Sequence, residues 1–276
     1  IMAEHIPPQQ SQSISRPPSA GDIFANKAFR VLTLVFTWGI ILLLAYILCK
    51  IGGRAIPAIK EYGFGLLTGT TWDVNNKVFG ILPEIWGTLY SSLLALLLGG
   101  FFGVTIAIFL TQNFLPRVLE TILRSIIELL AAIPSVVYGL WGIFVLIPLI
   151  RPLADFLNTH FSWIPFFSTS LSGPGMFPAA LVLSIMILPT VAAISQDAFQ
   201  AIPRKTVEAA YGMGTTRWEA ILRVMLPTAA GGIFGALVLG LGRALGETMA
   251  LAMVVGNSNQ ISLSVFAPAN TLAALL

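Results

Sequence analysis

The feature that most constrains this sequence is a pair of charged residues inside a long apolar segment. Arg243 and Glu247 lie within the run PTAAGGIFGALVLGLGRALGETMALAMVVGN, which begins at Pro227 and ends at Asn257. Placing either charge at the centre of a lipid bilayer costs about 2.5–3.5 kcal/mol on insertion scales. Both side chains are therefore expected to face protein or water rather than lipid.

The whole chain has the composition of a protein embedded in a membrane. Of its 276 residues, 56% are hydrophobic and only 10% are charged, whereas soluble domains carry about 25% charged residues. We expect an all-α integral membrane protein surrounded by lipid, because a helix satisfies its own backbone hydrogen bonds. The net charge of +3 indicates topology rather than a nucleic-acid partner. The only cysteine, Cys49, has no partner for a disulfide or a metal site, so a buried apolar thiol is expected.

Five apolar segments are long enough to cross a bilayer as helices, which takes about 20 residues. They cover residues 31–48, 86–110, 126–150, 177–195 and the run that follows Pro227. Pro134 and Pro189 fall inside the third and fourth segments, where a proline removes a backbone hydrogen bond and tends to kink the helix. Kinks in neighbouring helices make room for a cavity, although prolines are also common in membrane helices that have no role in transport.

The remaining organisation follows from these segments. Residues 1–30 are predicted to be a largely disordered cytoplasmic tail, because their first part is rich in Pro, Ser and Gln. Residues 31–50 are assigned to the first transmembrane helix, residues 51–85 to an external loop, and residues 86–276 to a transmembrane core. This orientation places more Lys and Arg residues inside than outside, and the segment between the fourth and fifth spans contributes most to the difference.

That charged segment, RKTVEAAYGMGTTRWEAILRVMLP, is too short and too polar to span a membrane. It breaks at Gly212 and Gly214 and resumes with Trp218, Ile221 and Leu222 at helical apolar spacing. The chemistry of the segment alone leaves two alternatives. The segment either lies on the membrane surface or docks onto a partner protein.

A motif within it favours docking. Glu208, Ala209, Ala210 and Gly214, followed at fixed spacing by Val224 and the Leu-Pro pair that ends at Pro227, resemble the EAA-x3-G-x9-I-x-LP motif of ABC-importer permeases, with Val where Ile is usual. The resemblance implies a coupling helix that fits a groove on an ATP-binding subunit, with the first four residues as docking residues. The chain itself lacks a G-x-x-x-x-G-K-[ST] phosphate loop. We therefore expect no cofactor and no enzyme activity in this chain, with ATP and Mg bound by a separate ATPase.

The charged pair indicates the substrate. Arg243 lies about 24 Å along a helix from Pro227, near or somewhat outside the bilayer centre. On a continuous helix, Glu247 would share its face one turn further out. A guanidinium at this depth suits a multi-oxygen anion, to which it gives paired hydrogen bonds. The alternative is a salt bridge that holds helices together, and exchange of partners would allow both roles.

Small residues flank the pair at helical spacing. Gly231, Gly235, Gly242 and Gly246 form two G-x-x-x-G patterns, which allow the backbones of membrane helices to approach closely. The pattern predicts tight packing against a neighbouring subunit, although glycine is also simply frequent in membrane helices.

Two further titratable residues are expected to have no part in transport. Glu128 lies four residues after Arg124, so an ion pair between them at the membrane interface is expected. His160 is expected to be solvated in an outer loop, because no second metal ligand accompanies it.

The segments GLGRALGETMALAMVVGN and ELLAAIPSVVYGLWGIFVLIPLIRP closely resemble the PstC-type permeases of phosphate-specific ABC importers. The resemblance implies a type I ABC importer transmembrane domain in the bacterial plasma membrane, working by alternating access, with Arg243, Glu247 and Thr248 on the substrate pathway. It also implies a PstA-type permease, a PstB-type ATPase dimer and an external phosphate-binding protein as partners. The family has six spans and five are visible here, so a last helix after Leu276 is expected.

Three alternatives remain at this point. Another oxyanion, sulfate or molybdate, is possible because the external binding protein does most of the selecting in such importers. An ATP-independent channel would conduct ions without any ATPase. A membrane enzyme is disfavoured, because the spans contain no metal-ligand cluster and no nucleophile with a neighbouring base.

Overall fold

The computed structural model describes residues 19–73, 75–76, 78–112 and 114–275. Contacts divide the chain into two units, Ile1–Gly63 and Phe64–Leu276. Within the described part, five helical segments are long and apolar enough to cross a membrane, namely Ala20–Tyr62, Leu82–Thr111, Ser135–Phe161, Met176–Gln200 and Arg217–Leu245. The predicted all-α membrane class is confirmed.

In the described part of the first unit there is one helix, α1 (Ala20–Tyr62). Ser19 caps its start, because its hydroxyl accepts a hydrogen bond from the backbone of Asp22 while the Asp22 carboxylate accepts one from the Ser19 backbone. Residues 20–30 of the predicted tail are therefore helical, and residues 1–18 lie outside the described residues. No residue of α1 is buried, and Cys49 is exposed. The expected burial of Cys49 is wrong, because α1 has no other described element of its own unit to pack against.

The second unit begins with short elements that replace most of the predicted external loop. They are helix α2 (Gly65–Thr68) and the antiparallel strands β1 (Trp72–Asp73) and β2 (Val78–Phe79). Trp72 pairs with Phe79 across the hairpin, with ring centroids 5.0 Å apart. Hydrogen bonds from the side chain and backbone of Asn76 and the backbone of Asn75 lower the pKa of Asp73 at the turn.

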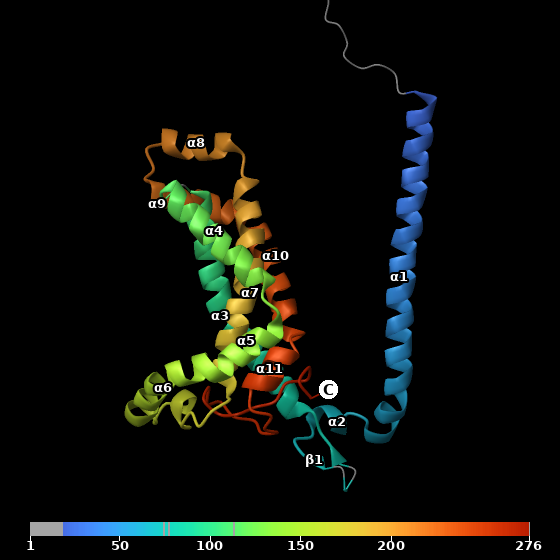
Figure 1. The fold of residues 1–276 in the computed structure, drawn as a ribbon, viewed down its shortest axis with the longest axis vertical. Helices are drawn as coiled ribbons and strands as arrows, with labels where there is room; N and C mark the ends of the chain where they lie inside the picture. Colours follow the sequence, from blue (N-terminus) through green and yellow to red (C-terminus); the bar gives the residue numbers. More distant parts are fainter. Residues whose placement is uncertain (1–18, 74, 77, 113, 276) are drawn as a thin grey trace, which may run out of the picture. The chain divides into compact units, whose positions relative to one another are not determined.

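Three long helices form the centre of the second unit: α3 (Leu82–Thr111), α7 (Met176–Gln200) and α10 (Leu226–Leu245). Helix α7 contacts both α3 and α10 (Figure 1). It is the most buried of the five spans, and Pro189 lies inside it as predicted. Residues of all three helices share one apolar cluster around Leu183 and Ile187. The core of this unit therefore surrounds α7.

Glycines at the contacts of α7 allow this close approach. A Cβ added to Gly99 would lie 2.6 Å from the carbonyl oxygen of Ser184. A Cβ added to Gly103 would lie 3.0 Å from the Val191 side chain. At Gly240 of α10 it would lie 2.8 Å from Val191. These distances are shorter than ordinary van der Waals contacts, so only glycine fits without a shift of the helices.

Two spans contain π-helical turns that accommodate a proline. The segment η1 (Gly142–Leu146) joins α5 (Ser135–Trp141) to α6 (Ile147–Phe161), and η3 (Ala220–Met225) joins α9 (Arg217–Glu219) to α10. Pro148 and Pro227 follow these segments. A proline lacks the backbone N–H and clashes with the carbonyl four residues earlier. The extra residue in a π turn displaces that carbonyl, so both helices continue through the proline.

The predicted third span, 126–150, has the wrong boundaries. Helix α4 (Arg117–Ala132) ends before Pro134, which precedes α5 as its cap residue rather than kinking a continuous helix. The residue before a proline is restricted to extended backbone, and Ile133 has φ −70° and ψ 128°. The span is instead Ser135–Phe161. His160, predicted in a loop, lies in the last turn of α6 and is exposed.

The end of the second unit folds back onto the first turns of α3. After the short helix α11 (Met249–Val254) the chain is irregular. The Trp86 indole donates to the Ser262 carbonyl at 3.0 Å, the Tyr90 hydroxyl donates to the Leu263 carbonyl at 2.9 Å, and the Thr88 hydroxyl accepts from the Leu272 backbone at 2.9 Å. The remaining elements are η2 (Pro165–Phe167) and α8 (Arg204–Gly212).

The packing around α7 gives a first prediction. Replacing Gly240 with Val should lower the thermal unfolding temperature and the membrane abundance of the protein, because overpacking costs about 1–3 kcal/mol. The matched control is Gly39→Val in α1, where an added side chain meets nothing within 4 Å. Thermal unfolding of the purified variants measures the difference, and equal stability of the two would contradict the packing.

Candidate functional site

Arg243 lies in the last turn of α10 and is exposed. Its Nη1 atom donates to the hydroxyl oxygen of Thr190 at 3.3 Å. Thr190 follows Pro189 on α7 and is half-buried. The close approach of Gly240 to Val191 sets the two helices at the distance that this contact needs. A charged side chain of α10 is thus held by a neutral hydroxyl of α7.

Glu247 is not on the same helix as Arg243. Helix α10 ends at Leu245, and Gly246 caps it with φ −92° and ψ 0°. The Glu247 carboxylate accepts a hydrogen bond from the Ala250 backbone at 3.3 Å, in the first turn of α11. The expected continuous helix is therefore wrong. Glycine weakens helix here, and the carboxylate satisfies an amide that a new helix start leaves unpaired.

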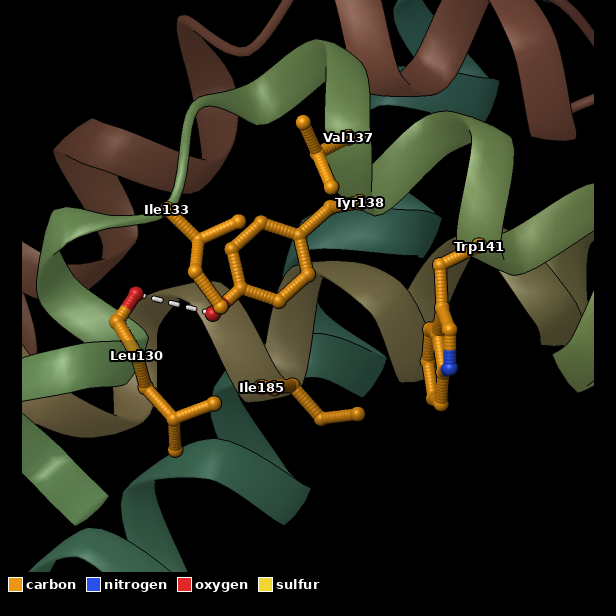
Figure 2. Close-up of a pocket in the computed structure, with 6 residues that line it drawn as sticks. All are labelled: Leu130, Ile133, Val137, Tyr138, Trp141 and Ile185. Atoms are coloured by element: carbon orange, nitrogen blue, oxygen red, sulfur yellow. Dashed lines mark hydrogen bonds between the residues drawn. The ribbon is translucent and has the colours of Figure 1, made fainter.

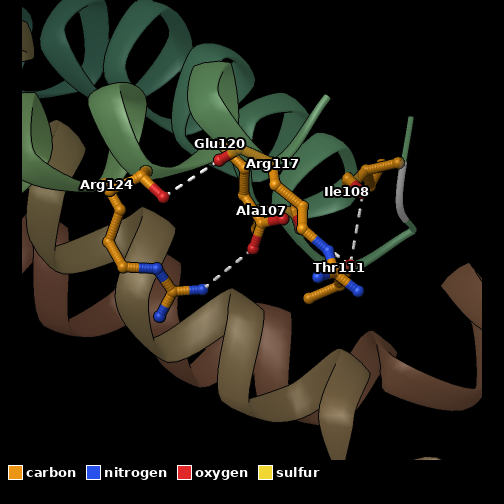
Figure 3. A network of polar contacts seen from close by, with 7 residues as sticks. Ala107, Ile108, Thr111, Arg117, Glu120 and Arg124 are labelled. Carbon is orange, nitrogen blue, oxygen red and sulfur yellow. Dashed lines mark hydrogen bonds and ion pairs between the residues drawn. The ribbon is translucent and has the colours of Figure 1, made fainter. Parts of the chain in front are cut away.

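The ion pairs differ from those predicted. Within the described residues, the only ion pair shorter than 4.0 Å joins Arg124 to Glu120 at 3.5 Å (Figure 3). The expected pair of Arg124 with Glu128 is thus wrong, because the Arg124 guanidinium pairs instead with the Glu120 carboxylate, one turn earlier in α4. Arg243 has no carboxylate within 4.0 Å among the described residues. The salt-bridge alternative for Arg243 and Glu247 has no support from this geometry.

Thr248 and Thr190 complete the group around Arg243. Thr248, predicted from the family resemblance, is exposed beside the break between α10 and α11, with its hydroxyl 3.5 Å from the Gly246 carbonyl oxygen. Thr190 was missed by the sequence analysis. The signal for it was its place directly after Pro189 inside an apolar span, where a hydroxyl residue stands out.

A pocket of about 310 Å³ lies at the break between α4 and α5 (Figure 2). It is lined by apolar or aromatic side chains from α4, α5, α7 and the α4–α5 junction, namely Leu130, Ile133, Val137, Tyr138, Trp141 and Ile185. The Tyr138 hydroxyl donates to the Leu130 carbonyl at 2.8 Å, as Figure 2 shows. A cavity was expected from kinks at Pro134 and Pro189; this pocket lies instead where Pro134 separates two helices. Such an apolar lining does not suit an oxyanion.

The turn between α8 and α9 has the predicted glycine joint. Gly214 has φ +83°, and its backbone donates to the Tyr211 carbonyl at 2.9 Å. The Thr215 hydroxyl donates to the Ala210 carbonyl at 2.8 Å. Thr216 then starts α9 by a reciprocal pair of hydrogen bonds with Glu219. The break predicted at Gly214 is therefore confirmed.

The four residues of the EAA pattern differ in exposure. Glu208, Ala209 and Gly214 are exposed, whereas Ala210 is only 1% exposed. The Ala210 side chain is buried within its own chain, so its expected role as a docking residue is not supported. The small side chain at this position is buried within the loop.

An aromatic stack supports the same loop. The rings of Phe114 and Trp218 are stacked with centroids 5.2 Å apart, and the Arg217 guanidinium lies 5.0 Å from the Phe114 ring centre. Phe114 belongs to the connection after α3, whereas Trp218 and Arg217 belong to α9. The stack therefore fixes α9 against the end of α3.

Comparisons with known proteins now decide the family. The profile described as "Binding-protein-dependent transport system inner membrane component" matches residues 99–272. The phosphate transport system permease protein PstC of Mesorhizobium japonicum is 41% identical over 242 residues, which cover 83% of this chain and 74% of the relative. The PstC protein of Haemophilus influenzae is 40% identical over 253 residues, 90% of this chain and 80% of the relative.

The chain belongs to the inner membrane components of binding-protein-dependent transport systems. The resemblance to PstC-type permeases is thereby confirmed. A solved structure of the MetNI methionine ABC transporter in inward-facing conformations matches 63% of this permease and 72% of its own chain, with a TM-score of 0.48 and 21% identity.

The glycines that were predicted to pack against a neighbour face open space in this permease. An added Cβ at Gly231, Gly235 or Gly242 would meet nothing within 4 Å, and at Gly246 it would meet only the Gly242 carbonyl oxygen at 3.5 Å. They make no close helix contact within the described chain. The surface that they form is open in this chain. Packing of a second subunit on this surface stays a prediction.

The turn at Gly214 gives a second prediction. Gly214→Ala should weaken the turn by about 1–2 kcal/mol, because an L side chain is strained at positive φ. The matched control is Gly212→Ala, where φ is not positive and an added Cβ meets nothing within 4 Å. Hydrogen exchange of the amides at residues 210–216 should be about 5- to 30-fold faster in the first variant only. Unchanged exchange in Gly214→Ala would refute the joint.

Proposed function

We propose that this permease is the transmembrane subunit of an ATP-driven importer that moves inorganic phosphate across the plasma membrane by alternating access. The observation that carries the proposal is the state of Arg243. Its guanidinium is exposed on a membrane-spanning helix, without a carboxylate within 4.0 Å among the described residues. The relatives of the chain that are about 40% identical are named phosphate transport permeases.

The chemistry of the guanidinium fits this substrate. It presents a planar fork of N–H donors that matches two oxygens of one anion. One donor is directed at Thr190, which leaves others for a ligand. An unpaired positive charge in a region of low polarity attracts an oxyanion strongly. The Glu247 carboxylate is engaged at the start of α11, so it does not compete for that charge at close range.

Release must follow from a change in these contacts. The break at Gly246 separates α11 from α10. Glu247 and Thr248 are therefore attached to α11, whereas Arg243 belongs to α10. A rearrangement at this break would move a carboxylate relative to the guanidinium. Approach of Glu247 would offer Arg243 an alternative partner and would favour release of the anion.

The partners of such an importer are proposed from the exposed surfaces. A PstA-type permease would cover Gly231, Gly235, Gly242 and Gly246, which face open space in this chain. A dimer of PstB-type ATPase subunits, which would bind ATP and Mg, would dock at Glu208, Ala209 and Gly214. An external phosphate-binding protein would deliver the substrate. This chain supplies the pathway and no cofactor.

The orientation is proposed from charge. The loop from Arg204 to Arg223 is rich in basic residues, and an excess of Lys and Arg marks the cytoplasmic side. With this loop inside, the N-terminus is also cytoplasmic and the ATPase surface faces ATP. We place the protein in a bacterial plasma membrane as a multi-pass subunit.

Substitutions of Arg243 test the proposed function in the assembled complex in liposomes. Arg243→Lys keeps the charge but loses the fork, so ATP-driven uptake of radiolabelled phosphate should fall about 10-fold or more, and Arg243→Gln should fall further. Arg124→Lys is the matched control, because an exposed ion pair contributes only about 0–1 kcal/mol.

A charge exchange separates the pathway role from a structural salt bridge. The double variant Arg243→Glu with Glu247→Arg should stay inactive at normal membrane abundance, because the guanidinium no longer lies beside Thr190. Recovered uptake would support a salt bridge instead. If the complex imports sulfate or molybdate but not phosphate, the substrate is that other oxyanion. Ion conductance by this chain without an ATPase would indicate a channel.

A further inference from the structure

Thr190 differs from most helical threonines of the described residues in its hydrogen bonding. A threonine inside a helix commonly donates its hydroxyl to the carbonyl four residues earlier. This bond is present, at 2.6–2.9 Å, in Thr33, Thr37, Thr88, Thr105, Thr111, Thr121, Thr159 and Thr228. The Thr190 hydroxyl oxygen instead accepts from Arg243. Its hydroxyl hydrogen has no acceptor among the described residues.

The position of Thr190 is fixed by the most tightly packed part of the protein. Its neighbours Pro189 and Val191 are buried, Val191 completely. Val191 contacts Gly103 of α3 and Gly240 of α10 at distances that leave no room for another side chain. Thr190 therefore presents its hydroxyl from a rigid support, which is what a binding group requires.

We propose that Thr190 is a second binding residue for the oxyanion, and that it acts together with Arg243. The oxygen of the hydroxyl accepts one guanidinium N–H and so orients the fork. The hydrogen of the same hydroxyl is donated to an oxygen of the substrate, while the remaining N–H groups of Arg243 donate to that anion. The ligand class is a tetrahedral oxyanion, and this inference rests on the proposed function of Arg243.

The two hydrogen bonds reinforce one another. A hydroxyl that accepts from a cation is a better donor, because the positive charge polarises its O–H bond. A hydrogen bond to an anion is stronger than one between neutral groups, with a net contribution of about 1.5–3 kcal/mol. If Thr190 only joined α7 to α10, its hydroxyl oxygen would accept from Arg243 and its hydroxyl hydrogen would have no role.

The first test compares two substitutions at this position in the complete transporter, with its ATPase and binding protein in liposomes. Thr190→Val keeps the shape and removes the hydroxyl, so phosphate uptake normalised to membrane abundance should fall about 10-fold or more. Thr190→Ser keeps the hydroxyl and should retain most of the uptake. Thr105→Val is the matched control, because it removes a hydroxyl that bonds only to its own helix.

The outcomes separate this inference from the proposed function. If the wild-type complex imports phosphate and Thr190→Val imports it equally well, the inference fails while the proposed function stands. If Thr190→Ser loses as much uptake as Thr190→Val, the hydroxyl is not the active group and the inference also fails. If the wild-type complex does not import phosphate, the proposed function itself fails.

A binding measurement gives a readout that does not depend on transport. Equilibrium binding of radiolabelled phosphate to the permease–ATPase complex, without the external binding protein, should give a dissociation constant about 10-fold higher for Thr190→Val than for the wild type. Thr190→Ser and Thr105→Val should bind as the wild type does, and chloride at equal ionic strength should not displace the label. Equal dissociation constants for Thr190→Val and the wild type would overturn the assignment of Thr190 to the binding site.

Discussion

The close contact of α7 with α3 and α10 is the constraint on which the rest of the second unit depends. The contact exists because Gly99, Gly103 and Gly240 present no side chain to α7. Without a hydrophobic force between helices in lipid, such backbone approach and the van der Waals contact it allows are what hold membrane helices together. The same contact determines that Arg243 of α10 meets Thr190 of α7. Stability and the placement of the functional charge therefore have one physical origin.

The electrostatics of the site follow from where helices end. Had α10 continued past Gly246, Glu247 would have lain one turn from Arg243 and the two charges would have paired. The helix ends at Leu245 instead, and the carboxylate binds the start of α11. The guanidinium is left with a neutral partner, which keeps its charge available for an anion. The helix break thus leaves the Arg243 guanidinium without a carboxylate within 4.0 Å among the described residues.

Part of this structure could be predicted from the sequence, and the part that could not has definite physical reasons. Spans were predicted because apolar length is dictated by bilayer thickness, and the joint at Gly214 because glycine interrupts helical spacing. Helix ends at Pro134 and Gly246 were missed, because a proline or glycine within an apolar run is compatible with both a kink and an end.

Spacing of small residues also does not say which helix lies opposite. Gly99 and Gly103 have the same G-x-x-x-G spacing as Gly231 and Gly235, but only the first pair packs closely among the described residues. Ala210 was predicted for docking, but its side chain is buried within this chain. A motif gives residue types without giving the direction of their side chains.

The central claim is that Arg243 and the hydroxyl beside it hold the transported anion. An experimental structure of the whole transporter, trapped with phosphate during turnover, tests it most directly. We expect tetrahedral density within hydrogen-bond distance of the Arg243 guanidinium, on the side that faces the pathway, with Glu247 out of contact. Phosphate density elsewhere in the pathway, with Arg243 and Glu247 joined in an ion pair, would contradict it.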